Sequence, residues 1–521
     1  MKTWLPLLLG VSTAFLYLVT AQRAFYDDGI RFEAMLAADN LSYIHILYLP
    51  VVAFIRDTLP LAGVDAEIAL KITAAVSGGA TVAMTCRIAL ETLIHPGKAI
   101  AVALLLAGLF GFWFHSTATE LHAFHAAFAS CLLLGLIRIV DAPQRVTFGL
   151  LLLLFVGAIV TPASHASGVA TGLPILGALY YAKGARLRMV VALGAGFAVW
   201  GGLYYYLYAQ DGLFQGYSSA QSGKLPHLLA NPGLLPGQIQ AVAAELLLYS
   251  VPASTLIPAG VRVLRQRAPK HAVLCVLWIL GWAILALPVG DRAYGSNFIA
   301  TMPAQALLAV VALHGLATSP FRMVLVTVLT FLPLAAFLWL GELSALYVYL
   351  GSALLLLLMT RPVTARPRWP FLLHLVLAVA STTLMLPIVQ RDPIRDNIAA
   401  VSVAAGPKAM VLFFETMPNT HATWVRYFPG ADKPTGRAFN PFYVQFLPSP
   451  DVAAVLDGYR RRIRAQVARK GRLFATYPEG SKDKVLRYKD LLAQFEAELR
   501  RDFEFQRTTV PDLFELRKRT P

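Results

Sequence analysis

Long apolar runs follow one another along most of this sequence, and they constrain its fold more than any other feature. A helix needs about 20 predominantly apolar residues to cross the hydrocarbon core of a membrane. Runs of this kind recur from Thr3 to about Ile388. The chain is 57% hydrophobic and 14% charged, whereas an ordinary soluble domain is about 45–50% apolar and about 25% charged. The sequence therefore predicts a multi-pass α-helical membrane protein.

The apolar runs and the residues that break them predict about thirteen transmembrane helices. These helices are expected near residues 3–21, 66–90, 98–114, 121–140, 146–163, 168–183, 189–209, 240–261, 271–288, 296–316, 321–339, 342–359 and 371–389. With Lys2 in the cytoplasm, the loops on the cytoplasmic side carry most of the basic residues that lie between the spans, and the outside loops carry few. Because Lys and Arg are retained on that side, the pattern predicts a cytoplasmic N-terminus and an external C-terminus. Topology thus accounts for much of the net charge of +16, and no nucleic-acid partner is predicted.

Two apolar segments allow a second interpretation. The first run follows Lys2 and ends in Val19-Thr20-Ala21, which a signal peptidase could cleave, although the run is longer than a usual signal core. The stretch 42–55, "SYIHILYLPVVAFI", has 14 residues and contains Pro50. We interpret it as a helix in the outer interface, since it is too short to span.

The last part of the chain is polar and predicts a separate folded domain. Residues 1–390 form the membrane domain, and residues 391–521 form a small α/β domain outside the cytoplasm. Short apolar runs predict strands at 408–414, 442–448 and 471–478, while 451–470 and 482–502 predict charged amphipathic helices. Alternation of strands and helices is typical of an α/β domain.

Ionisable residues gather at the predicted outer ends of the membrane segments. Asp27 and Asp28, in "RAFYDDGIRF", come directly after the first span, and a pair of carboxylates at this point could simply cap the helix that begins near Gly29. The same side holds Glu120, His122, His125, His165, Asp291 and Arg292. Ionisable groups at membrane depth are costly and usually functional. Their concentration on one side predicts a functional site at the outer surface.

Three segments resemble the GT-C glycosyltransferase superfamily, and in particular the multi-pass family grouped with protein O-mannosyltransferases. "YDDGIRFEAMLAADN" followed by "SYIHILYLP" is similar to the first outer loop of that family, which places Asp27, Asp28 and His45 on its motif residues. "FHSTATELHAFHAAFA" places Glu120 and His125 on the family's acid and histidine. "TPASHASGVATGLPIL" places His165 on another histidine. Ile30 and the missing Pro-Pro-Gly depart from the family pattern.

The resemblance implies a GT-C-like fold and the transfer of a sugar from a polyprenyl-phosphate carrier to an acceptor outside the cytoplasm. In that reaction Asp27, with Asp28 beside it, would take the proton of the attacking hydroxyl. Glu120, His125, His165 and His45 would bind substrate. The acceptor would be a glycan, a lipid or a protein, and the host membrane the inner membrane of a bacterium.

The remaining candidate residues concern the donor phosphate and a metal ion. Arg292 has the planar fork that matches phosphate, although it could instead anchor the span by pairing with Asp291. Lys224 is a second candidate cation. A divalent ion, Mg²⁺ or Mn²⁺, could be held by Asp27 and Glu120. No spacing in the sequence requires such a site.

Helical geometry restricts how Glu120 and the nearby histidines can act together. Glu120 and His125 lie about 140° apart on a regular helix, so both can face one site only if the helix starts after Glu120. His122 shares a helix face with His125, although a single histidine on a helix is more often structural.

Two other classes of protein fit the apolar pattern. A transporter or lipid flippase would favour internal repeats and ionisable residues near the membrane centre, and neither feature is clear here. A receptor or assembly factor with an external α/β domain would depend on residues 390–521 and not on Asp27 and Asp28.

Overall fold

A computed structural model describes most of the chain. The described residues are 4–22, 29–37, 41, 45–58, 65–93, 95–210, 224–288, 296–316, 320–360, 376, 379–380, 382–383, 400–401, 403–406, 409–413, 438–439, 449–476, 489–510 and 513–519. They divide into two compact units. The first unit comprises residues 1–23, 45–204 and 224–388, and the second comprises residues 24–44, 205–223 and 389–521.

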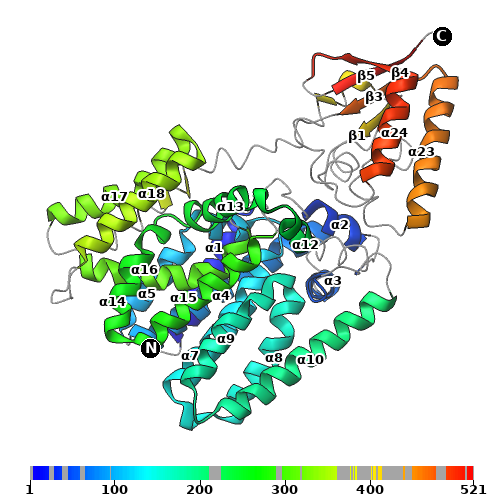
Figure 1. Cartoon of the computed structure of the whole chain (residues 1–521). Helices are drawn as coiled ribbons and strands as arrows, with labels where there is room; N and C mark the ends of the chain where they lie inside the picture. Colours follow the sequence, from blue (N-terminus) through cyan, green and yellow to red (C-terminus); the bar gives the residue numbers. More distant parts are fainter. Residues whose placement is uncertain are drawn as a thin grey trace. The chain divides into compact units, whose positions relative to one another are not determined.

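The first unit is built from helices (Figure 1). Its α-helices up to residue 210 are α1 (Trp4–Val19), α3 (Tyr48–Thr58), α4 (Ala66–Leu93), α5 (Pro96–Ala107), α6 (Phe110–Thr117), α7 (His122–Asp141), α8 (Phe148–Ser164), α9 (Gly172–Tyr181) and α10 (Arg186–Gln210), of which α10 runs into the second unit. Those after residue 223 are α12 (Lys224–Ala230), α13 (Leu235–Leu248), α14 (Ile257–Arg267), α15 (Pro269–Ala286), α16 (Met302–Leu316), α17 (Pro320–Leu340) and α18 (Glu342–Met359). Short 3-10 turns join several of them, including η3 (Ala166–Thr171).

Four described helices are long and apolar enough to cross a membrane: α4, α7, α10 and α15. The helices α5 and α6 would form a fifth span if they are one segment, bent by 65° at their junction. Five further apolar segments, of 10–17 residues, include α1 and α8. The predicted multi-pass helical architecture is therefore present among the described residues, whereas the predicted number of thirteen spans stays a prediction.

The helix α3 has the length expected for an interfacial helix. Its 11 residues extend over about 16 Å at 1.5 Å per residue, roughly half of the hydrocarbon thickness. Tyr48, Leu49 and Val52 on α3 are buried, whereas Phe54 is 67% exposed. A helix this short does not cross the membrane as a straight segment.

Close backbone contact fixes α1 against α4. A Cβ atom added at Gly10 would lie 2.8 Å from the carbonyl oxygen of Gly79. A Cβ atom added at Gly79 would collide with the carbonyl oxygen of Gly10 and lie 2.7 Å from the Cβ atom of Ala14. Small residues at a helix crossing let the two backbones approach closely, which is a common way for membrane helices to pack.

The helices α4 and α7 form the centre of the site-bearing part of the first unit. The helix α4 packs against α1, α5 and α7, and α7 packs against α8 (Figure 1). At one end of this group, Arg138 of α7 and Arg87 of α4 both bind the carboxylate of Glu91 on α4. The N-terminal turn of α7 carries His122 and His125.

The second unit contains a five-stranded mixed sheet with the order β2-β1-β3-β5-β4. The strands are β1 (Met410–Phe413), β2 (Ala438–Phe439), β3 (Leu473–Thr476), β4 (Phe503–Arg507) and β5 (Leu513–Lys518). The strand β1 is parallel to β2 and to β3, and β5 is antiparallel to both β3 and β4. The α-helices of this unit include α2 (Gly29–Ala37), α23 (Ser449–Ala468) and α24 (Lys489–Asp502).

Alternation of side chains gives this sheet two apolar faces. Met410 and Leu412 of β1 point to the face that holds Leu456 of α23 and Phe495 of α24. Val411, between them, packs instead in the cluster of Val401, Ala405 and Phe474. Beside the neighbouring strands β3 and β5, the Arg472 guanidinium donates to the Glu515 carboxylate over 2.8 Å, and it holds the pKa of that carboxyl below its usual value.

The strands and helices predicted from sequence in this region overlap with four of the observed elements. The strands expected at 408–414 and 471–478 contain β1 and β3, and the two charged helices correspond to α23 and α24. The strand expected at 442–448 lies outside the described residues. The sequence did not predict β4 and β5.

Candidate functional site

Five histidines and one glutamate from separate segments of the first unit converge. We call this group the histidine cluster, and its members are His45, His115, Glu120, His122, His125 and His165. The His165 ring stacks on the His45 ring, with 4.3 Å between centroids and 12° between planes. The same ring lies 5.3 Å from the His122 ring and 5.2 Å from the His125 ring. The His115 ring completes the group, 5.1 Å from the His122 ring.

The break between α6 and α7 brings Glu120 into the cluster. The helix α6 ends at Thr117 and α7 begins at His122, so Glu120 lies in the connection and is not bound by helical spacing. Its side chain is only 1% exposed, and its Oε2 lies 3.9 Å from His122 Nε2. The helix α7 begins after Glu120, which is the condition under which Glu120 and His125 can face one site. Glu120 and His125 therefore belong to one cluster.

Backbone hydrogen bonds define which ring nitrogens of His45 and His165 carry the proton. The Ala166 N–H donates to His45 Nδ1 over 3.2 Å, and the Ser167 N–H donates to His165 Nδ1 over 3.0 Å. A ring nitrogen that accepts a hydrogen bond has no proton, so in both neutral rings the proton is on Nε2. His165 lies in the connection after α8, where loss of surrounding water lowers its pKa to about 4. These two rings therefore offer Nε2–H donors.

His125 has the opposite arrangement. Ser164 Oγ donates to the carbonyl oxygen of Thr161 over 2.7 Å, so its own proton is already used. The contact of 2.9 Å between Ser164 Oγ and His125 Nδ1 must then be donated by the ring nitrogen. The proton of the neutral ring is on Nδ1, and Nε2 carries a lone pair. His125 Nε2 is buried and has no hydrogen-bond partner among the described residues.

The cluster thus combines groups that serve acid–base and anion-binding chemistry. Glu120 supplies a buried carboxylate, and His125 Nε2 supplies a neutral acceptor. His165 supplies a hydrogen-bond donor for an oxygen atom of a ligand. A buried acceptor without a partner costs free energy unless a ligand or water satisfies it. A hydroxyl group bound at His125 would supply that partner.

The structure describes some of the residues predicted from sequence and not others. It brings together His45, Glu120, His125 and His165. Lys224 is the first residue of α12 and is half-buried, and the contacts that define the cluster do not include it. Asp27, Asp28 and Arg292 lie outside the described residues, so their roles stay predictions.

Two members of the cluster were not predicted as site residues. The sequence favours a structural role for His122 and gives no role to His115. The signal available in the sequence was density: His115, His122 and His125 fall within a stretch of eleven residues, "HSTATELHAFH". The chain has only 11 histidines in all, so three in so short a stretch is a concentration that spacing rules for a single helix overlook.

The described residues of the cluster do not form a metal site. No group of three or more His, Cys, Asp or Glu side chains in the described part of the chain is arranged to hold an ion. The donor set is rich in imidazole and has one carboxylate, whereas Mg²⁺ and Mn²⁺ prefer oxygen ligands. A site for either ion would need Asp27 in addition to Glu120.

The chain shares its fold with a solved membrane protein. No protein-family profile matches it, and no curated protein matches it. The crystal structure of ArnT from Cupriavidus metallidurans in the apo state aligns with a TM-score of 0.50 at 13% identity, covering 98% of this chain and 97% of ArnT. The structure of the same protein bound to undecaprenyl phosphate aligns with a TM-score of 0.48 at 13% identity, covering 99% of this chain and 97% of that one. The chain has the fold of ArnT.

The fold shared with ArnT confirms the mostly helical architecture that the sequence predicted. The likeness to ArnT extends over nearly the whole of both chains. The three segments that carry the resemblance also supply His45, Glu120, His125 and His165 to the histidine cluster. Residues from three separate motifs of the sequence therefore lie in contact.

Proposed function

We propose that this protein is a glycosyltransferase that moves a sugar from a polyprenyl-phosphate-linked donor to an acceptor at the extracytoplasmic face of the membrane. The observation that carries the proposal is the histidine cluster within a GT-C fold. It joins a buried carboxylate, Glu120, to the unpartnered acceptor His125 Nε2 and to two rings with Nε2–H donors. We place the protein in the inner membrane of a bacterium.

The proposed donor class follows from the shared fold. ArnT has been solved bound to undecaprenyl phosphate, and the apo form of ArnT shares its fold with this chain. A lipid phosphate has oxygens that accept hydrogen bonds, and His165 has an Nε2–H group to donate. Arg292 and Lys224 are the proposed cations for the same phosphate.

The proposed reaction exchanges one bond to the anomeric carbon for another. The oxygen of an acceptor hydroxyl attacks the anomeric carbon, while the bond from this carbon to the phosphate oxygen breaks. The hydroxyl proton passes to a carboxylate, for which we propose Asp27 with Asp28 beside it. The polyprenyl phosphate leaves with the electrons of the broken bond. Glu120 and His125 hold the acceptor and the sugar. A divalent ion at Asp27 and Glu120 is proposed only as an addition to this scheme.

The test uses the purified full-length chain with a polyprenyl-phosphate sugar whose sugar carries a radioactive label. Transfer of the label to an acceptor, or its release to water, measures the reaction. We expect Asp27→Asn to lower the rate by about a hundredfold or more, since a positioned acid or base contributes about 10²–10⁴-fold. Glu120→Gln should lower it by about tenfold or more, because it removes a hydrogen bond to a charged group, worth about 1.5–3 kcal/mol. The control is Asp57→Asn, which removes an exposed carboxylate paired with its neighbour Arg56.

The outcomes separate an enzyme from a carrier. Transfer or release of sugar that depends on Asp27 and Glu120 supports the proposal. A protein that moves the labelled lipid across a vesicle membrane and never breaks the sugar–phosphate bond would be a flippase. Full activity in both variants would contradict the assigned site.

A further inference from the structure

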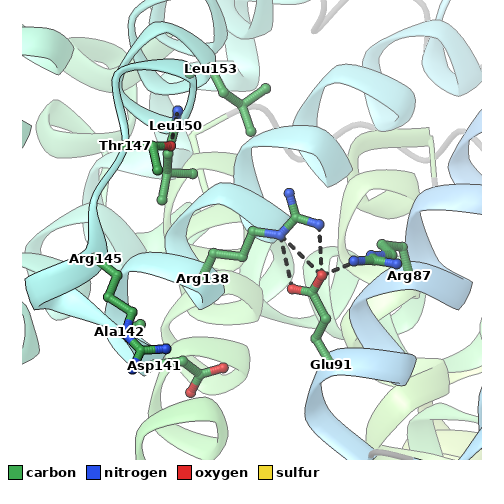
Figure 2. A pocket seen from close by; sticks show the side chains of 10 residues that line it. Arg87, Glu91, Arg138, Asp141, Ala142, Arg145, Thr147, Leu150 and Leu153 are labelled. Atoms are coloured by element: carbon green, nitrogen blue, oxygen red, sulfur yellow. Dashed lines mark hydrogen bonds and ion pairs between the residues drawn. The ribbon is translucent and has the colours of Figure 1, made fainter. Parts of the chain in front are cut away.

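A second polar site lies at the opposite end of α7 from the histidine cluster. It is a hollow of about 640 Å³, which we call the basic pocket. The pocket is lined by Arg87, Glu91, Arg138, Asp141, Ala142, Arg145, Thr147, Gly149, Leu150 and Leu153 (Figure 2). The reaction proposed above makes no use of these residues.

The arginines of the basic pocket differ in how they are paired. Arg138 donates to the Glu91 carboxylate from Nη2 over 2.7 Å and from Nε over 3.0 Å. Arg87 Nε donates to the same carboxylate over 2.8 Å. Figure 2 shows the two guanidinium groups converging on Glu91. The Arg145 side chain is exposed, and its guanidinium makes no hydrogen bond or ion pair with any described residue, although the Arg145 backbone N–H donates to the carbonyl oxygen of Ala142. One cation of the pocket is therefore available to a ligand.

The charge of the pocket favours an anion. Its lining has three guanidinium groups and two carboxylates, and Asp141 is also engaged by His271, over 2.6 Å. Lys270 adds an ammonium group next to the pocket, where its Nζ donates to the carbonyl oxygen of Val140 over 3.3 Å. Arginine forms strong paired hydrogen bonds with phosphate oxygens, which makes phosphate the best-matched anion.

The position of the pocket along α7 places it at a membrane surface. His122 begins this helix and Asp141 ends it, and at 1.5 Å per residue the two lie about 28 Å apart. The hydrocarbon core is about 30 Å thick. If the histidine cluster lies at one surface, the basic pocket lies at the level of the lipid headgroups of the other. Positive-inside counting assigns this other surface to the cytoplasm.

An exposed apolar strip on α8 continues from the pocket. Phe148, Leu152 and Val156 are 80%, 47% and 43% exposed, and their spacing of four residues puts them on one face of the helix. Gly149, Leu150 and Leu153 of the same helix line the pocket itself. A soluble anion would gain nothing from such a strip, whereas the acyl chains of a lipid would lie along it.

We propose that the basic pocket binds the phosphate headgroup of an anionic membrane lipid from the cytoplasmic leaflet. Arg145 donates to the phosphate oxygens, and Arg138 and Lys270 add a longer-range attraction. The acyl chains lie along the exposed face of α8. Binding at this pocket does not depend on the reaction proposed above. It supplies a lipid contact about one hydrocarbon thickness away from the histidine cluster.

The experiment measures lipid binding to the full-length protein in detergent by native mass spectrometry. The probes are phosphatidylglycerol, phosphatidylcholine and inorganic phosphate. The variant is Arg145→Gln, whose side chain makes no contact that the fold needs. Its matched control is Arg265→Gln, which removes one exposed guanidinium from α14, outside the pocket lining.

We expect phosphatidylglycerol to bind more tightly than phosphatidylcholine, and Arg145→Gln to weaken its binding about fivefold, the effect of one arginine at a charged lipid surface. Arg265→Gln should leave binding unchanged. Equal binding of the two lipids, or equal losses in the two variants, would overturn the proposal. Inorganic phosphate that displaces phosphatidylglycerol at equal concentration would also overturn it, because the site would then serve a soluble anion.

Discussion

At the scale of single residues, the contact between Ser164 and His125 decides how the cluster can act. Ser164→Ala would remove the acceptor of the His125 Nδ1–H group and release the ring to take the other tautomer. One lost hydrogen bond costs about 0.5–1.5 kcal/mol, so we expect the transfer rate to fall about three- to tenfold. The control Ser130→Ala removes a buried hydroxyl of α7 whose Oγ has no partner among the described residues. A rate equally affected in both variants, measured with the labelled donor, would contradict this role.

The sequence identified candidate site residues but not the tautomers of their histidine rings. Motif likeness selected His45, Glu120, His125 and His165, and the structure brings them into contact. The tautomers depend on the backbone amides of Ala166 and Ser167 and on the Ser164 hydroxyl, and these contacts exist only in the folded chain. A pattern of residue types carries no information about them.

At the scale of elements, the crossing of α1 and α4 at Gly10 and Gly79 sets how closely these helices approach. We expect Gly79→Ala to destabilise the protein by about 1–3 kcal/mol, the usual cost of overpacking, because the new Cβ atom would meet the carbonyl oxygen of Gly10 and Ala14. Gly201→Ala on α10 is the matched control, since a Cβ atom there would meet nothing within 4 Å. Thermal unfolding in detergent measures both variants. A Gly79→Ala protein as stable as the Gly201→Ala protein would show that the contact relaxes without cost.

The elements missed by sequence reasoning are those with weak apolar content. The strand β4, "FEFQR", begins with alternating apolar and polar side chains, and β5, "LFELRK", has three apolar residues of six and no regular alternation. Both strands contain charged residues, and β4 directly follows the charged helix α24, so the sequence does not distinguish them from polar segments. The strands β1 and β3 were predicted because they are buried on both faces and nearly continuous in apolar residues. A strand that is buried on both faces is therefore easier to predict from sequence than a strand that carries charged residues.

At the scale of the whole molecule, α7 connects two sites of different chemistry. Its first turn carries His122 and His125, and its last turn carries Arg138 with the end residue Asp141. The histidine cluster is mostly buried and has neutral rings at His45 and His165, whereas the basic pocket is open and carries excess positive charge. A membrane with its cytoplasmic face at the arginines and its outer face at the histidines matches both the positive-inside rule and the proposed reaction.

That orientation leads to a prediction for the entire chain. Arg186 and Arg188, with Lys183, should keep the loop near Gly184 in the cytoplasm, and an odd number of spans should place Pro521 outside. Alkaline phosphatase folds only outside the cytoplasm of a bacterium, so a fusion after Pro521 should be active and a fusion after Gly184 inactive. Fluorescent-protein fusions, which need the cytoplasm, should show the reverse pattern, with immunoblots to equalise expression. An inactive phosphatase after Pro521 together with an active one after Gly184 would invert the topology. The histidine cluster would then lie in the cytoplasm, where the proposed extracytoplasmic reaction could not take place.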